Sequence, residues 1–240
     1  MQDKSLLKAL TEAGAGSRRR LADSIKQGKV TVNGEAVESF NHPVNPEKDV
    51  VLFNGQRIDL NPTETVCLML NKPKGFLSTT HDERGRHTVI DLLPEKYRHL
   101  RLYPAGRLDE DSTGLLLLTN DGDLTYRLTH PKFEHEKEYL VHINGSLTKS
   151  AQQNLARGIR LEDGMTHPAI VKAVLDNPPF NYSITIHEGR KRQVRRMFER
   201  VKHPVIDLKR VRIGKLFLGS LKEGKVRQLN RAAINALSTI

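Results

Sequence analysis

Runs and alternations of apolar residues predict the main strands of the chain. Four consecutive leucines, residues 115–118, lie between Gly114 and the turn sequence Asn120-Asp121-Gly122. An apolar run of this length, bounded by turn residues, is typical of a buried strand. Alternating apolar and polar residues predict two further strands, over 137–143 and 183–187. An acidic loop, residues 109–111, thus leads into a buried strand, where a rigid scaffold can hold a reactive side chain open to a ligand.

Helical spacing of apolar residues predicts helices near the start of the chain and near residue 195. The leucines at 6, 7 and 10 predict a helix over 4–13. Ser17 is a natural N-cap for a second helix over 18–27. Apolar residues at 194, 197, 198 and 201 predict an amphipathic helix with a basic face.

The order of the elements predicts two domains. Two short strands follow the first two helices, over 29–32 and 49–53, and each ends at an Asn-Gly pair that favours a type I′ hairpin turn. The segment 59–65 is polar and contains a proline, a composition typical of a linker. We therefore predict a first domain over residues 1–60, a linker over 61–65 and a second domain over 66–240.

Shorter patterns predict the remaining elements of the second domain. A strand over 66–70 is followed by a rigid cationic turn, Asn71 to Gly75. The other predicted elements are helices over 123–128, 152–157 and 231–237 and short strands over 211–213 and 216–218.

Charge points to a polyanionic partner. The 240 residues carry a formal net charge of +11, and the isoelectric point is about 9.8. Residues 190–215 hold eleven Lys/Arg and two Asp/Glu, so most of the excess lies there. No stretch approaches the ~18 apolar residues of a membrane span, and the N-terminus has no signal-peptide apolar region. We expect a cytoplasmic protein that binds nucleic acid and no membrane.

The common catalytic motifs are absent from the sequence. Cys67 is the only cysteine, and no HExxH, Walker A or Gly-x-Ser-x-Gly sequence occurs. Asp109 to Gly114 matches half of an EF-hand loop, but Asn120 stands where that loop needs a bidentate glutamate. We therefore expect no metal and no cofactor. What remains is a carboxylate among arginines, for which a surface turn with an ordinary salt bridge is the alternative interpretation.

The first domain resembles a known RNA-binding module. The segment GSRRRLADSIKQGKVTVNGE is similar to the S-four-type (alpha-L) domain, in which two helices and a hairpin present a basic face to structured RNA. The resemblance implies RNA contacts by Ser17, Arg18, Arg19, Arg20, Lys26, Lys29 and Asn33. A solvated basic face is the alternative for these residues.

The second domain resembles the RsuA/RluB family of pseudouridine synthases. The string GRLDEDSTGLLLLTNDGDL carries the family signature, and LNKPKG, HEKEYLV and EGRKRQVRRMF follow in the family's order. The resemblance covers nearly the whole chain and implies an α+β fold, with a mostly antiparallel mixed sheet in the catalytic domain and a small alpha-L domain before it. It also implies isomerisation of uridine to pseudouridine in RNA, with no cofactor.

The resemblance also assigns roles to individual residues. Asp109 is implied as the catalytic carboxylate, which either attacks C1′ of the sugar or removes the C2′ proton. Tyr139 is implied to pack on the flipped base. Arg195 is implied to pair with Asp109, with Arg192 as the alternative. Further implied RNA contacts are Lys72, Lys74, Arg107, Arg190, Arg192 and Arg196.

The sequence favours one RNA substrate but leaves alternative substrates and functions open. KEYLV and the second helix are closer to the RluB type than to the RsuA type, which implies 23S rather than 16S ribosomal RNA. The partner is then ribosomal RNA or a ribosomal precursor particle, and we expect a monomer. A non-catalytic RNA-binding or assembly factor is the rival from another class.

Overall fold

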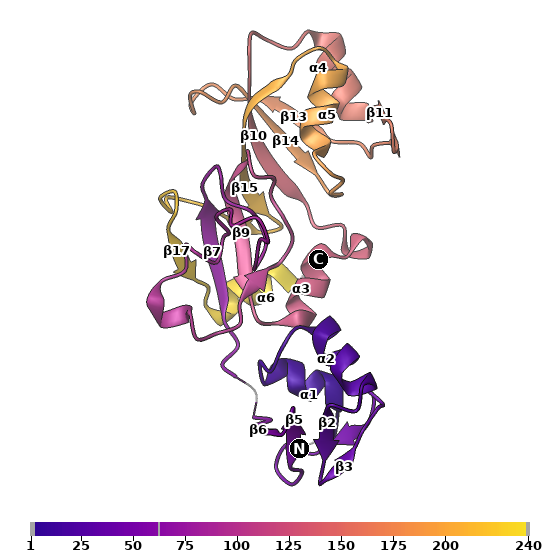
Figure 1. Cartoon of the computed structure of the whole chain (residues 1–240). Coiled ribbons are helices and arrows are strands. Elements are labelled where there is room, and N and C mark those ends of the chain that lie inside the picture. The colour runs from indigo at the N-terminus through magenta and orange to yellow at the C-terminus, as the bar shows by residue number, and fades with distance from the viewer. Residues whose placement is uncertain (1–2, 62, 239–240) are drawn as a thin grey trace. The chain divides into compact units, whose positions relative to one another are not determined.

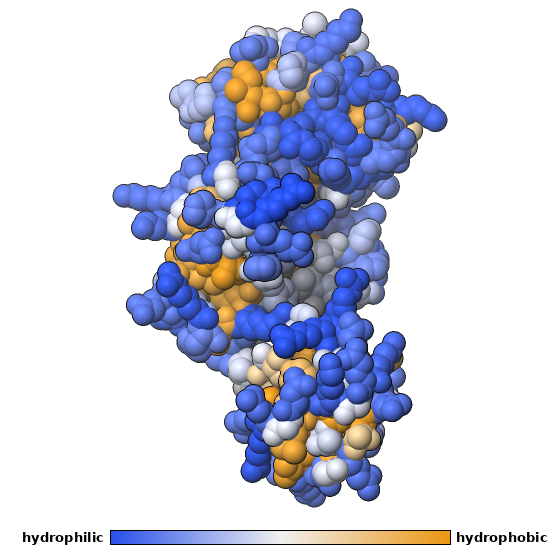
Figure 2. Space-filling view, viewed as in Figure 1, coloured by the Kyte–Doolittle hydropathy of each residue, from blue (hydrophilic) through white to orange (hydrophobic). Residues whose placement is uncertain are grey.

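The computed structural model describes residues 3–61 and 63–238, and the chain divides into two compact units. The first unit comprises Met1–Val66 with Arg98–Arg101, and the second comprises Cys67–Tyr97 with Leu102–Ile240. Figure 1 shows helices packed on sheet in each unit. Both units present mainly hydrophilic residues on the face seen in Figure 2.

The first unit packs two helices against short strands. Its helices are α1 (Leu6–Glu12) and α2 (Arg18–Lys26). Its strands are β1 (Lys4–Ser5), β2 (Val30–Val32), β3 (Glu35–Ala36), β4 (Pro43–Val44), β5 (Val51–Phe53) and β6 (Gln56–Ile58). The sheet order is β3-β2-β5-β6, with β1 paired to β4 separately. Leucines and valines of both layers form one buried core.

Local signals in the first unit act as the sequence predicts. The Ser17 hydroxyl accepts a hydrogen bond from the Arg20 N–H at 3.2 Å, which caps α2. Both Asn-Gly turns have positive φ at both positions, with 53° and 90° at Asn33 and Gly34. A type I′ turn requires this conformation, so the two predicted hairpin turns are confirmed.

The second unit is built on a nine-stranded sheet. Its path is β13-β14-β10-β15-β9-β7-β17, with β16 paired to β15 and β8 paired to β9. The strands are β7 (Cys67–Lys72), β8 (Tyr103–Pro104), β9 (Thr113–Thr119), β10 (Lys137–Ile143), β13 (Ile170–Ala173), β14 (Tyr182–Ile186), β15 (Val205–Ile213), β16 (Leu216–Phe217) and β17 (Val226–Gln228). A separate hairpin pairs β11 (Arg160–Leu161) with β12 (Gly164–Met165). All pairs are antiparallel except β9 with β15.

Helices cover the sheet of the second unit at both ends. The α-helices are α3 (Gly122–Thr129), α4 (Lys149–Arg157), α5 (Gln193–Arg200) and α6 (Arg231–Ser238), and the 3-10 helices are η1 (Glu95–Tyr97) and η2 (Pro131–Phe133). In Figure 1, α3 and α6 lie near β9, whereas α4 and α5 accompany β13 and β14. Residues 115–118 of β9 are fully buried, as the leucine run predicts.

Two predicted boundaries in the second unit are wrong. β7 continues through Asn71 and Lys72, which the sequence analysis placed in a turn, because both residues pair with β9. β15 has nine residues instead of three. The amphipathic helix begins only at Gln193, because Arg192 adopts the left-handed region with φ of 50°. The basic residues 190–192 therefore lie on a loop before the helix.

Within residues 3–61 and 63–238, no helix is both long and apolar enough to cross a bilayer.

Candidate active site

The acidic loop is fixed by the strand that follows it. Within the loop, the Ser112 N–H donates to the Asp109 carbonyl at 3.1 Å and closes a turn. At Gly114, with φ of +103°, a Cβ atom would meet the Arg210 carbonyl oxygen at 2.2 Å. Only glycine therefore allows β9 to pair in parallel with β15 at this point. The Asp109 side chain, 34% exposed, is left open at the edge of the sheet.

A buried lysine holds the acidic loop in place through hydrogen bonds. Lys72 is 0% exposed, and its Nζ donates to the carbonyl oxygens of Pro73, Glu110 and Ser112 at 2.9, 3.3 and 2.9 Å. Burial lowers the pKa of Lys72 to about 8, although the nearby carboxylates, Asp111 first, act in the opposite direction. The prediction that Lys72 contacts RNA is therefore wrong, because its ammonium group is enclosed by protein carbonyls.

Two arginines from α5 and the preceding loop bind the acidic loop. Arg192 makes a bidentate contact with the Asp111 carboxylate, at 3.0 and 2.9 Å, and lies 4.0 Å from Asp109 Oδ2. Arg195 contacts Asp111 instead, through its carboxylate at 3.3 Å and its carbonyl at 3.0 Å. These contacts hold the pKa of the Asp111 carboxyl below its usual value, with the Arg192 hydrogen bond as the largest cause. The structure thus gives Arg192, the alternative in the sequence analysis, the place beside Asp109.

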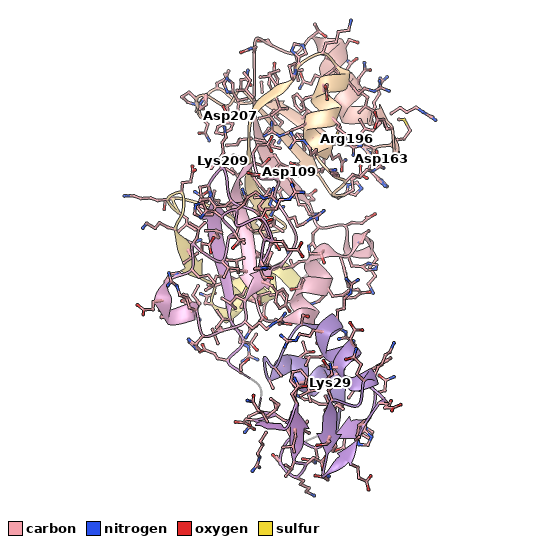
Figure 3. All side chains as sticks on the ribbon, viewed as in Figure 1. Lys29, Asp109, Asp163, Arg196, Asp207 and Lys209 are labelled. Carbon is pink, nitrogen blue, oxygen red and sulfur yellow. The ribbon has the colours of Figure 1, made fainter. Side chains whose placement is uncertain are left out.

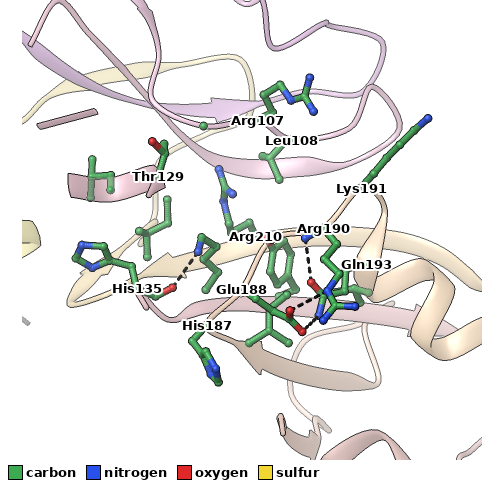
Figure 4. A pocket seen from close by; sticks show the side chains of 18 of the residues that line it. Arg107, Leu108, Thr129, His135, His187, Glu188, Arg190, Lys191, Gln193 and Arg210 are labelled. Atoms are coloured by element: carbon green, nitrogen blue, oxygen red, sulfur yellow. Dashed lines mark hydrogen bonds and ion pairs between the residues drawn. The ribbon is translucent and has the colours of Figure 1, made fainter. Parts of the chain in front are cut away.

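Asp109 and Tyr139 line one pocket in the second unit. The pocket has a volume of about 560 Å³, which is within the usual range for a small-molecule site. Arg107 and Arg192 lie on its wall with Asp109, and Tyr139 and Arg210 come from neighbouring strands. Figure 4 shows the loop of Arg107 and Leu108 above the strand that carries Arg210. The pocket can hold a nucleoside with its reactive atoms beside a carboxylate.

The loop before α5 is anchored through a partly buried network of hydrogen bonds. Glu188 accepts hydrogen bonds from the His167 N–H, Arg190 Nε and Gln193 Nε2, at 2.9, 2.9 and 2.6 Å. Burial alone would raise the pKa of Glu188, but these hydrogen bonds together lower it. Arg190 also donates to the Asp163 and Gly164 carbonyls. The network fixes the loop that presents Arg192 to the acidic stretch.

The remaining predicted RNA contacts fall into two groups. The basic side chains of the first unit, Arg18, Arg19, Arg20, Lys26 and Lys29, are all exposed. In the second unit, Lys74 pairs with Asp207 at 2.5 Å, and Arg196 pairs with Asp163 at 2.9 Å. Figure 3 labels both carboxylates together with Arg196 and Asp109. RNA contact by these residues stays a prediction.

The sequence analysis missed two pocket residues, Lys137 and Arg210. Lys137 precedes Tyr139 by two residues in a strand, and this period of two places both on the same face. That signal was available in the sequence. Arg210 stands opposite Tyr139 on β15, but no sequence pattern indicates this pairing.

Possible metal ligands and thiols are sparse in the described part of the chain. Within residues 3–61 and 63–238, no group of three or more His, Cys, Asp or Glu residues is arranged to hold a metal ion. Cys67 is buried, and burial raises the pKa of its thiol to about 12, so this thiol stays protonated.

Sequence comparison matches both units to known families. A model of the RNA pseudouridylate synthase family matches residues 66–200, and a model of the S4 domain matches residues 5–51. The chain belongs to the pseudouridine synthase family. The family and the catalytic activity implied by the sequence resemblance are therefore confirmed.

Relatives and a solved structure extend along the whole chain. The ribosomal large subunit pseudouridine synthase B of Bacillus subtilis is 42% identical over 238 residues, which cover 98% of this chain and 96% of that protein. An uncharacterized RNA pseudouridine synthase of Mycobacterium tuberculosis is 42% identical over 237 residues, covering 97% and 92%. A crystal structure of a pseudouridylate synthase, 35% identical, superposes with a TM-score of 0.69 and covers 98% of this chain and 99% of that one. These likenesses confirm the predicted α+β fold with its largely antiparallel sheet.

Proposed function

We propose that this pseudouridine synthase isomerises a uridine in 23S ribosomal RNA, with Asp109 as the catalytic carboxylate. The observation that carries the proposal is the pocket that Asp109, one-third exposed, lines together with Tyr139. The name of the Bacillus subtilis relative supports a large-subunit substrate. The same chemistry on 16S ribosomal RNA is the alternative for the substrate.

Asp109 acts at the sugar of the flipped nucleotide. Its carboxylate either attacks C1′ or removes the C2′ proton, and both routes need an ionised and well-oriented carboxylate. The guanidinium group of Arg192 lies 4.0 Å from the Asp109 carboxylate and places a positive charge beside it. Arg195 acts one step further out, because it holds the Asp111 carboxylate and carbonyl and so fixes the loop.

Tyr139 packs on the flipped uracil in this proposal. The side chain is 8% exposed and lines the pocket. An aromatic face offers stacking to a base that has left its helix. Arg107 is exposed on the pocket wall and is suited to bind a phosphate next to the flipped nucleotide.

The first domain, residues 1–60, supplies further RNA contacts through the exposed basic residues of α2 and Lys29. Residues 61–65 serve as a linker to the catalytic domain, residues 66–240. The substrate is ribosomal RNA or a ribosomal precursor particle, and we propose a cytoplasmic monomer.

The test is pseudouridine mapping in ribosomal RNA incubated with the protein. We expect one modified uridine in 23S RNA with the wild type and none with Asp109→Asn, which still binds the RNA. Asp111→Asn is the matched control, because Asp111 lies in the same loop as Asp109 but contacts Arg192 and Arg195. We expect this variant to form the product at a lower rate. Pseudouridine formation by Asp109→Asn would overturn the assignment of Asp109. Binding without modification by the wild type would point to an assembly factor.

A further inference from the structure

Two cationic side chains, one buried and one half-buried, line the active-site pocket. Arg210 is 3% exposed, and its Nε donates to the Leu115 carbonyl at 2.8 Å. Its Nη2 is buried without a hydrogen-bond partner. Lys137 donates to the His135 carbonyl at 3.0 Å. Burial, and then the nearby charge of Arg210, lower the pKa of Lys137 to about 8.

Neither cation is neutralised by a protein carboxylate. Among the described residues, no carboxylate oxygen lies within 4.0 Å of either side chain, because the neighbouring acids have other partners. Glu138 pairs with Arg212 at 2.8 Å, and Glu188 pairs with Arg190 at 2.9 Å. A buried charge without a counterion is costly in free energy. Its presence in the pocket points to a negative charge that the substrate supplies.

The two cations lie next to Tyr139, the residue proposed to pack on the uracil base. Arg210 is the register partner of Tyr139 across β10 and β15, and Lys137 lies on the same face of β10 as Tyr139. All three line the pocket with Asp109. Since Tyr139 is proposed to pack on the uracil, the cations lie beside the ring. The exposed arginines of the pocket wall are better placed for phosphates.

We propose that Arg210 and Lys137 stabilise the uracil anion that forms when the glycosidic bond breaks. This inference rests on the proposed function. When the C1′–N1 bond breaks, its electron pair leaves with the ring and spreads over N1, O2 and O4. Asp109 either forms a bond to C1′ or takes the C2′ proton. The ring then turns, and C5 forms a bond to C1′. In this step Asp109 is released from C1′ or returns its proton to C2′. Finally the proton on C5 is lost and N1 gains a proton.

Charge stabilisation at this step is catalytically productive. The negative charge is absent in the bound uridine and appears only as the bond breaks. Cations held in a water-poor pocket by protein contacts need no reorganisation when the charge develops. The two side chains therefore raise the rate of the chemical step more than the affinity for RNA.

The experiment compares single-turnover rates of Arg210→Met and Lys137→Met on the wild-type RNA substrate. We expect each rate to fall about 100-fold, as with the loss of one oxyanion-hole donor, with the Kd for RNA changed less than about threefold. The second substrate carries 5-fluorouridine at the target, and its consumption is measured. Fluorine stabilises the detached anion, so the defect of each variant is expected to shrink to about 10-fold or less.

Controls separate chemistry from folding. Arg212→Met removes an arginine from the same strand, but one that is paired with Glu136 and Glu138, and it should retain the wild-type rate. Thermal melts establish that each variant is folded. If Arg210→Met does not fold, Arg210→Lys and Lys137→Met decide, since Arg210→Lys keeps the charge and should lose less activity.

The outcomes are distinguishable. Rates within threefold of the wild type for both Lys137→Met and a folded Arg210 variant would overturn the inference. Equal defects on uridine and 5-fluorouridine with weaker RNA binding would also overturn it and indicate a phosphate anchor. A wild type without activity refutes the proposed function itself, whereas active variants refute only the role of these two cations.

Discussion

A single buried lysine links the acidic loop to the stability of the fold. Lys72 is fully enclosed and donates to three carbonyls, two of them from the loop that carries Asp109. Its pKa is lowered from 10.5 to about 8, chiefly by burial. The unfolded chain therefore binds more protons than the folded chain between these pH values. The free energy of unfolding then rises with pH in this window.

Lys72→Met makes this contribution measurable. We expect the variant to be less stable than the wild type at pH 7, because three carbonyl groups lose their hydrogen-bond donor. The difference should increase between pH 8 and 10.5 by up to about 3 kcal/mol, since one pKa unit corresponds to about 1.4 kcal/mol. Urea unfolding of both proteins across this pH range checks the prediction.

The difference in unfolding free energy between the two proteins cancels the contributions of other titrating groups. Lys137, whose pKa is also lowered to about 8, contributes equally to both. A difference in stability that stays constant from pH 8 to 10.5 would show that the pKa of Lys72 is not lowered in the folded protein.

Asp109 and Tyr139, both named in the sequence analysis, line one pocket, but the arrangement of the arginines around them was not predicted. Arg192 and Arg195 are three residues apart, a separation that places side chains on the same face of a continuous helix. The left-handed conformation of Arg192 ends that regularity, because α5 starts at the next residue. The charge of Arg192 thereby reaches Asp109, and no spacing pattern predicts such a local backbone change.

At the scale of elements, the parallel contact of β9 with β15 depends on one glycine. A Cβ atom at residue 114 would overlap the Arg210 backbone at 2.2 Å, and the backbone there has φ of +103°. We expect Gly114→Ala to separate the two strands, lower the Tm strongly and abolish activity, because the pocket takes residues from both sides of this contact. Thermal melts and pseudouridine formation measure the effect.

Gly145→Ala is the matched control for this prediction. Gly145 also has positive φ, at 71°, but no atom lies within 4 Å of the position of its Cβ. Its substitution carries only the backbone cost, on the order of 1–2 kcal/mol. If both variants lost the same stability, steric exclusion at Gly114 would have no role.

Strands with a regular pattern of apolar residues were predicted well from the sequence. Strands in which this pattern is interrupted were not. The leucine run of β9 and the alternation of β10 keep their period and were predicted almost to the residue. β15 was predicted only over its last three residues, because a register shift against β10 between Glu138 and Tyr139 breaks the alternation. Its buried positions, 208, 210 and 213, include an arginine. Pairing partners far apart in sequence fix such a strand.

For the whole molecule, the count of basic residues overstates the charge available to RNA. Residues 190–215 carry most of the excess charge, but several of these arginines are paired with carboxylates of the second unit. Arg192 binds Asp111, Arg196 binds Asp163, and Arg212 binds Glu136 and Glu138. The exposed arginines of α2 therefore gain importance as phosphate contacts.

The salt dependence of RNA binding tests this distribution of charge. If about six phosphates are engaged, the logarithm of the affinity should fall against the logarithm of salt concentration with a slope of roughly −4 to −5. Replacing Arg18, Arg19 and Arg20 with glutamine removes three cations at the start of α2. The slope should then become shallower by about 2–3, at about 0.7–0.9 per phosphate. Filter binding over a range of salt concentrations measures both slopes.

A control and a kinetic measurement decide where these arginines act. Arg57→Gln, which changes an exposed residue of β6, should alter the slope by no more than about one phosphate contact. The single-turnover rate at saturating RNA should stay at the wild-type value in the triple variant, because these contacts are equal in the bound and transition states. An unchanged slope would mean that the arginines of α2 do not contact RNA. A lower rate at saturation would mean that they help to place the uridine in the pocket.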